Sequence, residues 1–161
     1  MSDAWPDSVR LVTDFLAKAG AEVRVEEFPE GTRTAQDAAD AVGCKLGEIV
    51  KSLLFECDGR TVLALIPGDR RADTARIAAA AGTASAKVAS ADRVRELTGV
   101  DPGAVSPVPP PPVDLVLIDP RLLPPDSVWI GAGSPKHVAC LSPAELVRLT
   151  GAEQTDLVAD P

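Results

Sequence analysis

The sequence is poor in aromatic residues and in long apolar runs. It has no tyrosine, one histidine and one methionine, and aromatic residues make up 3% of the 161 positions. The core must therefore be built from Ala, Val, Leu and Ile. No segment approaches the roughly 18 consecutive apolar residues of a membrane-spanning helix, and residues 1–6 do not resemble a secretion signal. We expect a cytoplasmic protein with no membrane contact.

Cysteine and positive charge are also scarce. The three cysteines, Cys44, Cys57 and Cys140, are an odd number without C-x-x-C spacing, which argues against a disulfide framework or a structural zinc site. We expect them to be small, buried apolar side chains. The formal net charge of -8 argues against long-range capture of a nucleic-acid backbone, so any contact with RNA should be local.

The patterns in the first half of the chain predict helices around a β-hairpin. Apolar residues at helical spacing predict an amphipathic helix over 9–19, and charged and apolar residues alternate over 22–28 as in a half-buried strand. The best hairpin signal joins two apolar runs by a two-residue turn. The elements predicted here are a helix opened by the capping box Thr34-Ala-Gln-Asp37 and ended by Gly43, strands 49–57 and 61–66 around Asp58-Gly59, and helices 73–81 and 90–97.

The second half predicts three further strands and a last helix. Residues 101–112 hold so much Gly and Pro that they should form a loop, with Pro109 to Pro112 extended and stiff. The predicted strands are 115–118, 128–130 and 138–141, with a turn over 131–135; Ser142, Pro143 and Glu145 open a helix that stops at Gly151. The length suits one domain, residues 1–161, of the α+β class, with one mixed sheet and helices packed around it.

Lys51 is unusual because it lies within an apolar strand. If side chains alternate strictly, it shares a face with Ile49, Leu53 and Phe55, where a charge is costly unless it has a partner or a function. The structural alternative is a lysine on an edge strand that extends its ammonium into water and discourages aggregation.

A glycine-rich segment and the single histidine are further candidates. Gly131-Ala-Gly133-Ser134-Pro135 could let backbone N–H groups approach a carbonyl or anionic ligand, or could simply form a tight turn. His137 is the only imidazole available for acid–base chemistry, although it could equally be an ordinary surface or loop histidine. A nucleophile made from His137 and Cys140 is disfavoured because strand residues three apart face opposite sides.

Signatures of other enzyme classes are missing. There is no serine nucleophile elbow, no H-E-x-x-H and no cluster of acidic residues for a metal. Asp69, Asp73, Asp114 and Asp119 are isolated acids, most of which are better interpreted as helix caps and strand ends. These observations favour chemistry without a metal or cofactor.

The ordered set of motifs resembles the YbaK/EbsC-type aminoacyl-tRNA deacylase family, the stand-alone relatives of the prolyl-tRNA synthetase editing domain. The resemblance covers about residues 22–158, preceded by the N-terminal amphipathic helix, and implies a curved central sheet. It rests on Thr34-Ala-Gln-Asp-Ala-Ala, Gly43, Glu48-Ile-Val-Lys51-Ser-Leu-Leu-Phe, Val62 to Arg71, Leu97-Thr-Gly99, Gly103-Ala-Val-Ser-Pro107, Asp119, Gly131-Ala-Gly133 and Leu141-Ser-Pro-Ala-Glu-Leu146.

The resemblance implies roles for particular residues. Lys51 would be the central residue, holding the aminoacyl or terminal-ribose end of the substrate and stabilising the oxyanion together with backbone N–H groups. The other implied substrate-binding residues are Ser52 beside it, Thr34 near the entrance, Gly103, Ser106 and Pro107 in the lining, Gly131 and Gly133 at the border, and His137 in amino-acid selection. The family leaves the general base open between the substrate's ribose hydroxyl, its amine and, when the substrate carries cysteine, the substrate's own thiol. Here Val108 and four prolines follow where the family has an aromatic or Leu and then Gly, which puts the selected side chain in question.

Three functions remain open at this stage. The resemblance implies hydrolysis of mischarged aminoacyl-tRNA, most plausibly tRNA(Pro) carrying Ala, Cys or another small residue, with prolyl-tRNA synthetase as a potential partner. A second hypothesis is a non-catalytic module that binds the aminoacyl end or a synthetase, with residues 109–112 as a contact ridge. A third is hydrolysis of another small acyl ester or amide without RNA.

Overall fold

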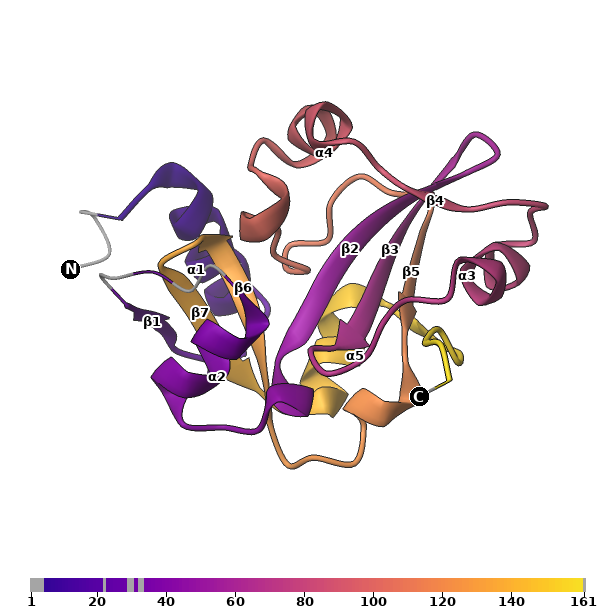
Figure 1. The fold of residues 1–161 in the computed structure, drawn as a ribbon. Helices are drawn as coiled ribbons and strands as arrows, with labels where there is room; N and C mark the ends of the chain where they lie inside the picture. Colours follow the sequence, from indigo (N-terminus) through magenta and orange to yellow (C-terminus); the bar gives the residue numbers. More distant parts are fainter. Residues whose placement is uncertain (1–4, 22, 29–30, 32–33, 161) are drawn as a thin grey trace.

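The computed structural model describes residues 5–21, 23–28, 31 and 34–160, and places two small sheets side by side with helices around them (Figure 1). The helices described are α1 Asp7–Lys18, α2 Ala35–Val42, α3 Thr74–Ala81, α4 Ala91–Thr98 and α5 Pro143–Thr150, with short 3-10 helices η2 Leu46–Glu48, η3 Pro102–Ala104 and η4 Pro120–Leu122. The strands are β1 Val25–Glu27, β2 Val50–Cys57, β3 Arg60–Pro67, β4 Lys87–Val88, β5 Leu115–Ile118, β6 Val128–Ser134, β7 His137–Leu141 and β8 Glu153–Gln154. No helix in the described part of the chain is long and apolar enough to cross a membrane.

Local sequence signals set the helix ends. An N-terminal side-chain cap satisfies backbone N–H groups that have no partner within the helix, and a left-handed glycine satisfies carbonyls at the other end. The N-caps of this kind are Thr34, Asp73, Ser90 and Ser142, and the left-handed C-terminal glycines are Gly43, Gly82, Gly99 and Gly151. The predicted helices over 9–19, 73–81 and 90–97, and those after Thr34 and Ser142, are therefore confirmed to within one or two residues.

The α+β class with a mixed sheet is confirmed, but the strands divide between two sheets. The larger sheet has the order β4-β2-β3-β5-β8, with β3 parallel to β5 and antiparallel to β2. The smaller sheet, β1-β7-β6, is antiparallel. One isolated bridge between Ile49 and Trp129 joins the two sheets at the base of β2. The gap beyond that bridge is where the candidate site lies.

The larger sheet has a core on each face because helices cover both. Leu63 and Leu65 of β3 belong to the cluster that also contains α1, α4, α5 and the smaller sheet. Val62, Ala64 and Ile66 turn to the opposite cluster with α3 and the C-terminal residues. A central strand covered on both faces reads as a continuous apolar run, which is why Val62 to Ile66 carries no alternation.

The structure corrects several sequence-based boundaries. The turn predicted over 131–135 is wrong: β6 continues to Ser134 through an irregularity in register, and the turn is at Pro135-Lys136. The strand expected over 22–28 is shorter, and residue 22 lies outside the described residues. The predicted loop 101–112 contains the 3-10 helix η3. Of the cysteines only Cys57 is buried, whereas Cys44 and Cys140 are half-buried free thiols.

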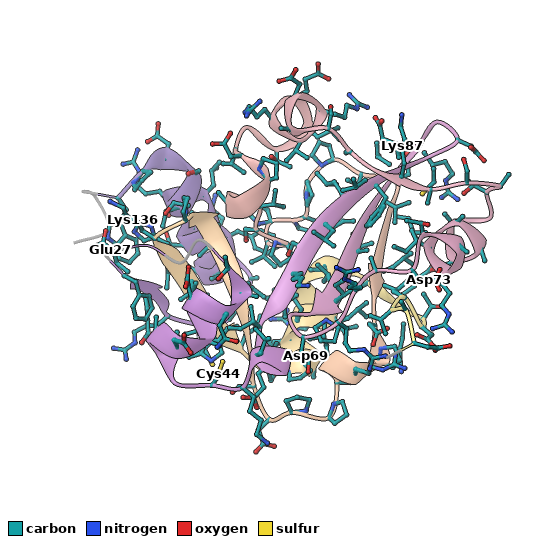
Figure 2. The ribbon with its side chains drawn as sticks, in the orientation of Figure 1. Glu27, Cys44, Asp69, Asp73, Lys87 and Lys136 are labelled. Carbon is teal, nitrogen blue, oxygen red and sulfur yellow. The ribbon has the colours of Figure 1, made fainter. Side chains whose placement is uncertain are left out.

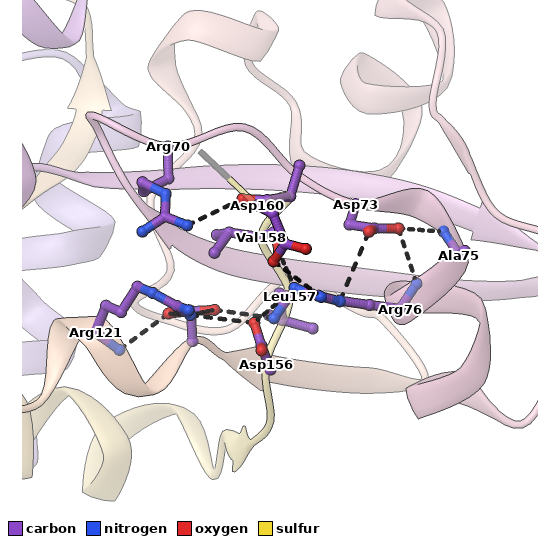
Figure 3. A network of polar contacts seen from close by, with 11 residues as sticks. Arg70, Asp73, Ala75, Arg76, Arg121, Asp156, Leu157, Val158 and Asp160 are labelled. Carbon is purple, nitrogen blue, oxygen red and sulfur yellow. Dashed lines mark hydrogen bonds and ion pairs between the residues drawn. The ribbon is translucent and has the colours of Figure 1, made fainter.

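A polar network fastens the C-terminal segment to the larger sheet (Figure 3). Asp119 is fully buried, and its carboxylate accepts hydrogen bonds from the backbone N–H groups of Leu157 and Arg121, each at 2.9 Å. The Arg121 guanidinium bridges this carboxylate to Asp156. Asp73 caps α3, and Asp114 bonds the backbone of Thr61. The interpretation of these three acids as caps and strand ends is confirmed.

Gly133 is required where α1 packs on β6. It has a φ of +97°, and an added Cβ would lie 2.5 Å from the carbonyl oxygen of Ser8. The Ser8 hydroxyl in turn donates to the Gly133 carbonyl at 2.7 Å. The helix and the strand can approach this closely only because residue 133 has no side chain.

We expect Gly133→Ala to destabilise the fold more than Gly99→Ala. Both glycines have positive φ, at +97° and +78°, so both variants incur backbone strain of about 1–2 kcal/mol. Gly99 has nothing within 4 Å of an added Cβ, whereas at position 133 the methyl group meets backbone atoms. The overpacking should cost Gly133→Ala about 1–3 kcal/mol more in denaturant unfolding. Equal losses in the two variants would contradict the close helix–strand contact.

We expect Asp119→Ala to lower the free energy of unfolding by about 1–3 kcal/mol, because it leaves the buried Leu157 N–H without an acceptor. Asp126→Ala makes the same truncation at an exposed position and should change stability by less than about 0.5 kcal/mol. Urea unfolding of the two variants provides the measurement, and a loss at Asp119 no larger than that at Asp126 would refute the anchoring role.

Candidate functional site

A cavity of about 190 Å³ lies between β2 and β6, the strands that belong to different sheets. Helix α2, η3 and the start of β7 contribute to its other walls. Its lining mixes apolar side chains with a few polar ones, as is usual for small-molecule sites. The lining residues are Thr34, Ala35, Ala38, Ile49, Val50, Lys51, Ser52, Leu53, Pro102, Gly103, Val105, Trp129, Ile130, Gly131, Ser134, His137 and Val138.

The fold brings together six of the nine residues that the sequence nominated. Residues far apart in the chain meet here because β2, β6, α2 and η3 converge on one gap. The six that line the cavity are Thr34, Lys51, Ser52, Gly103, Gly131 and His137. The three that do not are Ser106, Pro107 and Gly133.

Lys51 lies on β2, and its ammonium donates a hydrogen bond to the backbone carbonyl of Arg70 at 2.9 Å. Leu53 and Phe55, two and four residues further on, belong to the core cluster that contains α3, as the alternation predicted, whereas Ile49 belongs to a separate cluster with α2. The β4 strand pairs with β2 only at Phe55 and Glu56, so Lys51 lies where β2 is an edge strand. An ammonium has three donors, and the Arg70 carbonyl uses one of them.

Ser52 presents polar groups to the cavity. Its hydroxyl oxygen is buried and has no hydrogen-bond partner among the described residues. The Leu54 carbonyl, which points away from β3, accepts a bond from Ala89 beside β4. Alternate residues of a strand direct their backbone groups to the same edge, so the N–H and C=O of Ser52 point to this edge too. No strand of the described chain pairs with β2 at that point.

Three other predicted residues shape the walls. The Thr34 hydroxyl accepts a bond from the Asp37 backbone N–H at 3.0 Å, so it caps α2 while lining the cavity. An added Cβ at Gly131 would lie 3.0 Å from the Val105 carbonyl, which shows how closely β6 approaches the loop after η3. An added Cβ at Gly103 would meet nothing within 4 Å.

Ser106, Pro107 and Gly133 have other positions. The Ser106 hydroxyl donates to the Val108 carbonyl at 2.7 Å and holds the turn before the proline run. Ser106 and Gly133 line a separate cavity beside α1 and residues 108–112, and Pro107 lines neither cavity. The family resemblance implied these residues for the site, but their backbone positions direct them away from the first cavity, which Gly103, Gly131 and Ser134 line.

His137 is buried and has polar neighbours on both sides of its ring. Its Nδ1 lies 2.5 Å from the Ser134 hydroxyl oxygen, and its Nε2 lies 3.2 Å from the Glu27 carboxylate without reaching the angle of a hydrogen bond. The ring also meets that of Trp5 edge-on at 5.0 Å. Burial lowers the pKa of His137, and the charge of Glu27 opposes that shift. The interpretation of His137 as an exposed histidine is therefore wrong.

Sequence reasoning missed several lining residues. Trp129 pairs with Cys140 in the β6–β7 ladder, and Ala35 and Ala38 come from α2. A tryptophan in so aromatic-poor a chain was an available signal. Ser134 entered the sequence-based prediction only as part of a turn over 131–135. In the structure β6 continues to Ser134, and the turn follows it.

Comparison with known proteins gives the same family as the site residues. The family model described as the aminoacyl-tRNA editing domain matches residues 29–149. A crystal structure of a protein provisionally assigned as a trans-editing enzyme for prolyl tRNA synthetase is similar, with 36% identity and a TM-score of 0.90, covering 98% of this chain and 100% of the other. The structure of a hypothetical protein is also similar, at 33% identity, a TM-score of 0.86 and coverage of 92% and 99%.

Among curated proteins, the proline–tRNA ligase of Staphylococcus aureus strain Newman is 33% identical over 76 residues, which is 47% of this chain. The match spans only 13% of the ligase's length, so it relates the chain to one part of that enzyme. The family model covers most of the chain. The structural likeness agrees with it and extends over nearly the whole chain. The chain belongs to the aminoacyl-tRNA editing domain family.

Proposed function

We propose that this protein hydrolyses the ester of a mischarged aminoacyl-tRNA, with tRNA(Pro) carrying a small non-cognate amino acid such as Ala or Cys as its substrate. The observation that carries the proposal is the cavity between β2 and β6, which is lined both by Lys51 and by Ser52, whose buried hydroxyl has no hydrogen-bond partner among the described residues. A buried polar group without a protein partner is costly unless a ligand satisfies it. Membership of the editing-domain family supplies the class of ligand.

Lys51 is the residue we assign to the reacting ester. Its ammonium is held by the Arg70 carbonyl at 2.9 Å and keeps two further N–H donors for the substrate. A fixed positive donor next to the ester carbonyl stabilises the negative charge that develops when water attacks. The backbone groups of Ser52, with which no strand of the described residues pairs on this edge, can position the aminoacyl end beside it, and the proposed mechanism calls on no metal ion or cofactor.

The small cavity supports selection of a small side chain. Its volume is about 190 Å³, and its apolar wall includes Ala35, Ala38 and Ile130. The wall formed by β6 and the residue after η3 is closely packed, since an added Cβ at Gly131 would lie 3.0 Å from the Val105 carbonyl. One methylene group changes selectivity by only about 10- to 200-fold, so discrimination by size between neighbouring amino acids is modest.

The charge of the chain supports contact with only the aminoacylated end of the tRNA. A net charge of -8 gives no general attraction for the RNA backbone. Association with prolyl-tRNA synthetase in the cytoplasm would bring the substrate close without such attraction, and we include the synthetase as a proposed partner. The match to part of a proline–tRNA ligase supports this link.

We expect Lys51→Ala to lower the rate of deacylation by about 10²- to 10³-fold, as removal of an oxyanion donor does elsewhere. The measurement is release of amino acid from tRNA(Pro) charged separately with Ala, Cys, Ser and Pro. Lys87→Ala is the matched control, because Lys87 is an exposed lysine of β4 outside the cavity, and it should keep the wild-type rate (Figure 2).

The outcomes separate the hypotheses. Release from one mischarged tRNA that depends on Lys51 supports the editing function and names the amino acid. No release from any of the four by the wild-type protein would refute the proposal and favour a non-catalytic binding module. Release from a small aminoacyl ester at the same rate as from charged tRNA would favour a hydrolase that does not need RNA.

A further inference from the structure

Three side chains from different strands form a continuous polar chain at one wall of the cavity. Ser134 ends β6 and His137 begins β7, so the short turn between them places the hydroxyl 2.5 Å from Nδ1. Glu27 lies directly opposite His137 in the β1–β7 ladder, with its carboxylate 3.2 Å from Nε2. Figure 2 shows Glu27 and Lys136 at the same end of the smaller sheet. Ser134 and His137 line the cavity, whereas Glu27 lies behind the ring.

The neighbours of the ring favour one arrangement of its protons. An ionised carboxylate can only accept, so the Glu27 carboxylate, 3.2 Å from Nε2, favours the tautomer with the hydrogen on Nε2. In the neutral ring Nδ1 is then an acceptor. The Ser134 oxygen already accepts a bond from the Lys136 backbone N–H at 3.0 Å, and its own proton points to Nδ1. The Ser134 oxygen therefore keeps one lone pair that these two hydrogen bonds do not use.

We propose that Ser134, His137 and Glu27 form a proton relay that acts as the general base of the deacylation, an inference that rests on the proposed function. Ser134 contacts the attacking water, His137 takes up the proton, and Glu27 positions the ring. Glu27 contacts the imidazole because β1 pairs with β7 in a register that places Glu27 opposite His137. Neither Ser134 nor Glu27 was distinguished by its sequence context.

The bond changes and proton transfers of the relay add up to hydrolysis of the ester. The oxygen of water bonds to the ester carbonyl carbon while one of its protons passes to the Ser134 oxygen, whose own proton moves to Nδ1 of His137. The imidazolium faces the Glu27 carboxylate, which stabilises its charge. When the carbon–oxygen bond to the ribose breaks, the proton returns through Ser134 to the leaving oxygen. The products are the free amino acid and the tRNA hydroxyl, and all three side chains regain their starting state.

The surroundings of His137 keep it ready to accept a proton. The charged groups that act on the ring are Glu27 on β1 and Lys136 in the turn, and its other neighbours are the Ser134 hydroxyl and the Trp5 ring. Burial, the strongest influence, lowers the pKa of His137 below its ordinary value of 6.5, so the ring is neutral at pH 7. Because Glu27 raises this pKa, removing its charge should lower the pKa further.

We expect NMR titration to resolve this arrangement, because the chain contains a single histidine. The imidazole of the wild-type protein should titrate below 6.5 and that of Glu27→Gln lower still. Glu26→Gln is the matched control: the neighbouring carboxylate pairs with Val138 rather than His137, and its removal should leave the titration unchanged. A pKa that does not fall in Glu27→Gln would refute the role of Glu27.

The rate of deacylation as a function of pH tests the relay itself, with the charged tRNA(Pro) that the wild-type protein cleaves. Protonated His137 cannot accept a proton, so the wild-type rate should fall on the acid side through the pKa of this group. Ser134→Ala should lower kcat by about 10²-fold or more, change KM little and lose the acid limb. Ser134→Thr keeps a hydroxyl and should recover most of the rate, and Glu27→Gln should move the limb to lower pH.

The outcomes distinguish the relay from the proposed function. If the wild-type protein cleaves in a Lys51-dependent way but Ser134→Ala retains its kcat and its acid limb, the relay is wrong and the editing function stands. If no charged tRNA is cleaved by the wild-type protein, both proposals fail. Accumulation of an aminoacyl ester on Ser134, detected by intact mass, would replace the relay with a covalent mechanism. Equal unfolding midpoints for the variants and wild type exclude loss of fold as the cause.

Discussion

The candidate site depends on strand β2 being hydrogen-bonded along its whole length on one edge only. On that edge β2 and β3 pair over eight residues, from Val50 with Pro67 to Cys57 with Arg60. On the other edge β4 reaches only Phe55 and Glu56, and the smaller sheet touches the base of the strand through one bridge at Ile49. The unpaired middle of the edge leaves the backbone of Ser52 facing a gap rather than another strand. An edge of this kind offers a ligand the hydrogen bonds that a neighbouring strand would otherwise take.

In the β2–β3 hairpin, the side chains of Lys51 and Ser52 lie on opposite faces of β2. Because side chains alternate, Lys51 shares its face with Leu53 and Phe55 and meets the Arg70 carbonyl beyond the end of β3, whereas Ser52 turns with Leu54 toward the other core. Packing of α3 on one face and of the smaller sheet on the other holds β2 in register. The polar groups of the site therefore lie on a rigid strand, which is the arrangement that preserves catalytic geometry.

The smaller sheet supplies the second wall and its position is set by close backbone contacts. Gly133 lets α1 approach β6, and Gly131 lets β6 approach the loop at Val105. The irregular register between Gly131 and Ser134 ends with the hydroxyl of Ser134 beside His137. A regular continuation of β6 would change which side of the strand Ser134 faces, because side chains alternate along the strand. The glycine-rich segment thus shapes strand β6 beside the site, whereas the sequence had predicted a turn there.

The sequence by itself determined the local elements and the class of fold, and its resemblance to a family singled out Lys51 as the residue to test. Capping residues, left-handed glycines and the Asp58-Gly59 turn act within a few residues, so they can be identified without knowledge of distant contacts. The division into two sheets, the exclusion of Ser106 and Gly133 from the cavity and the meeting of Glu27 with His137 were decided only by the tertiary structure. These features depend on contacts between segments that are distant in the sequence. The meeting of Glu27 with His137 requires β1 to pair with β7, more than 100 positions away, and no local pattern in β1 specifies β7 as its partner or fixes their register.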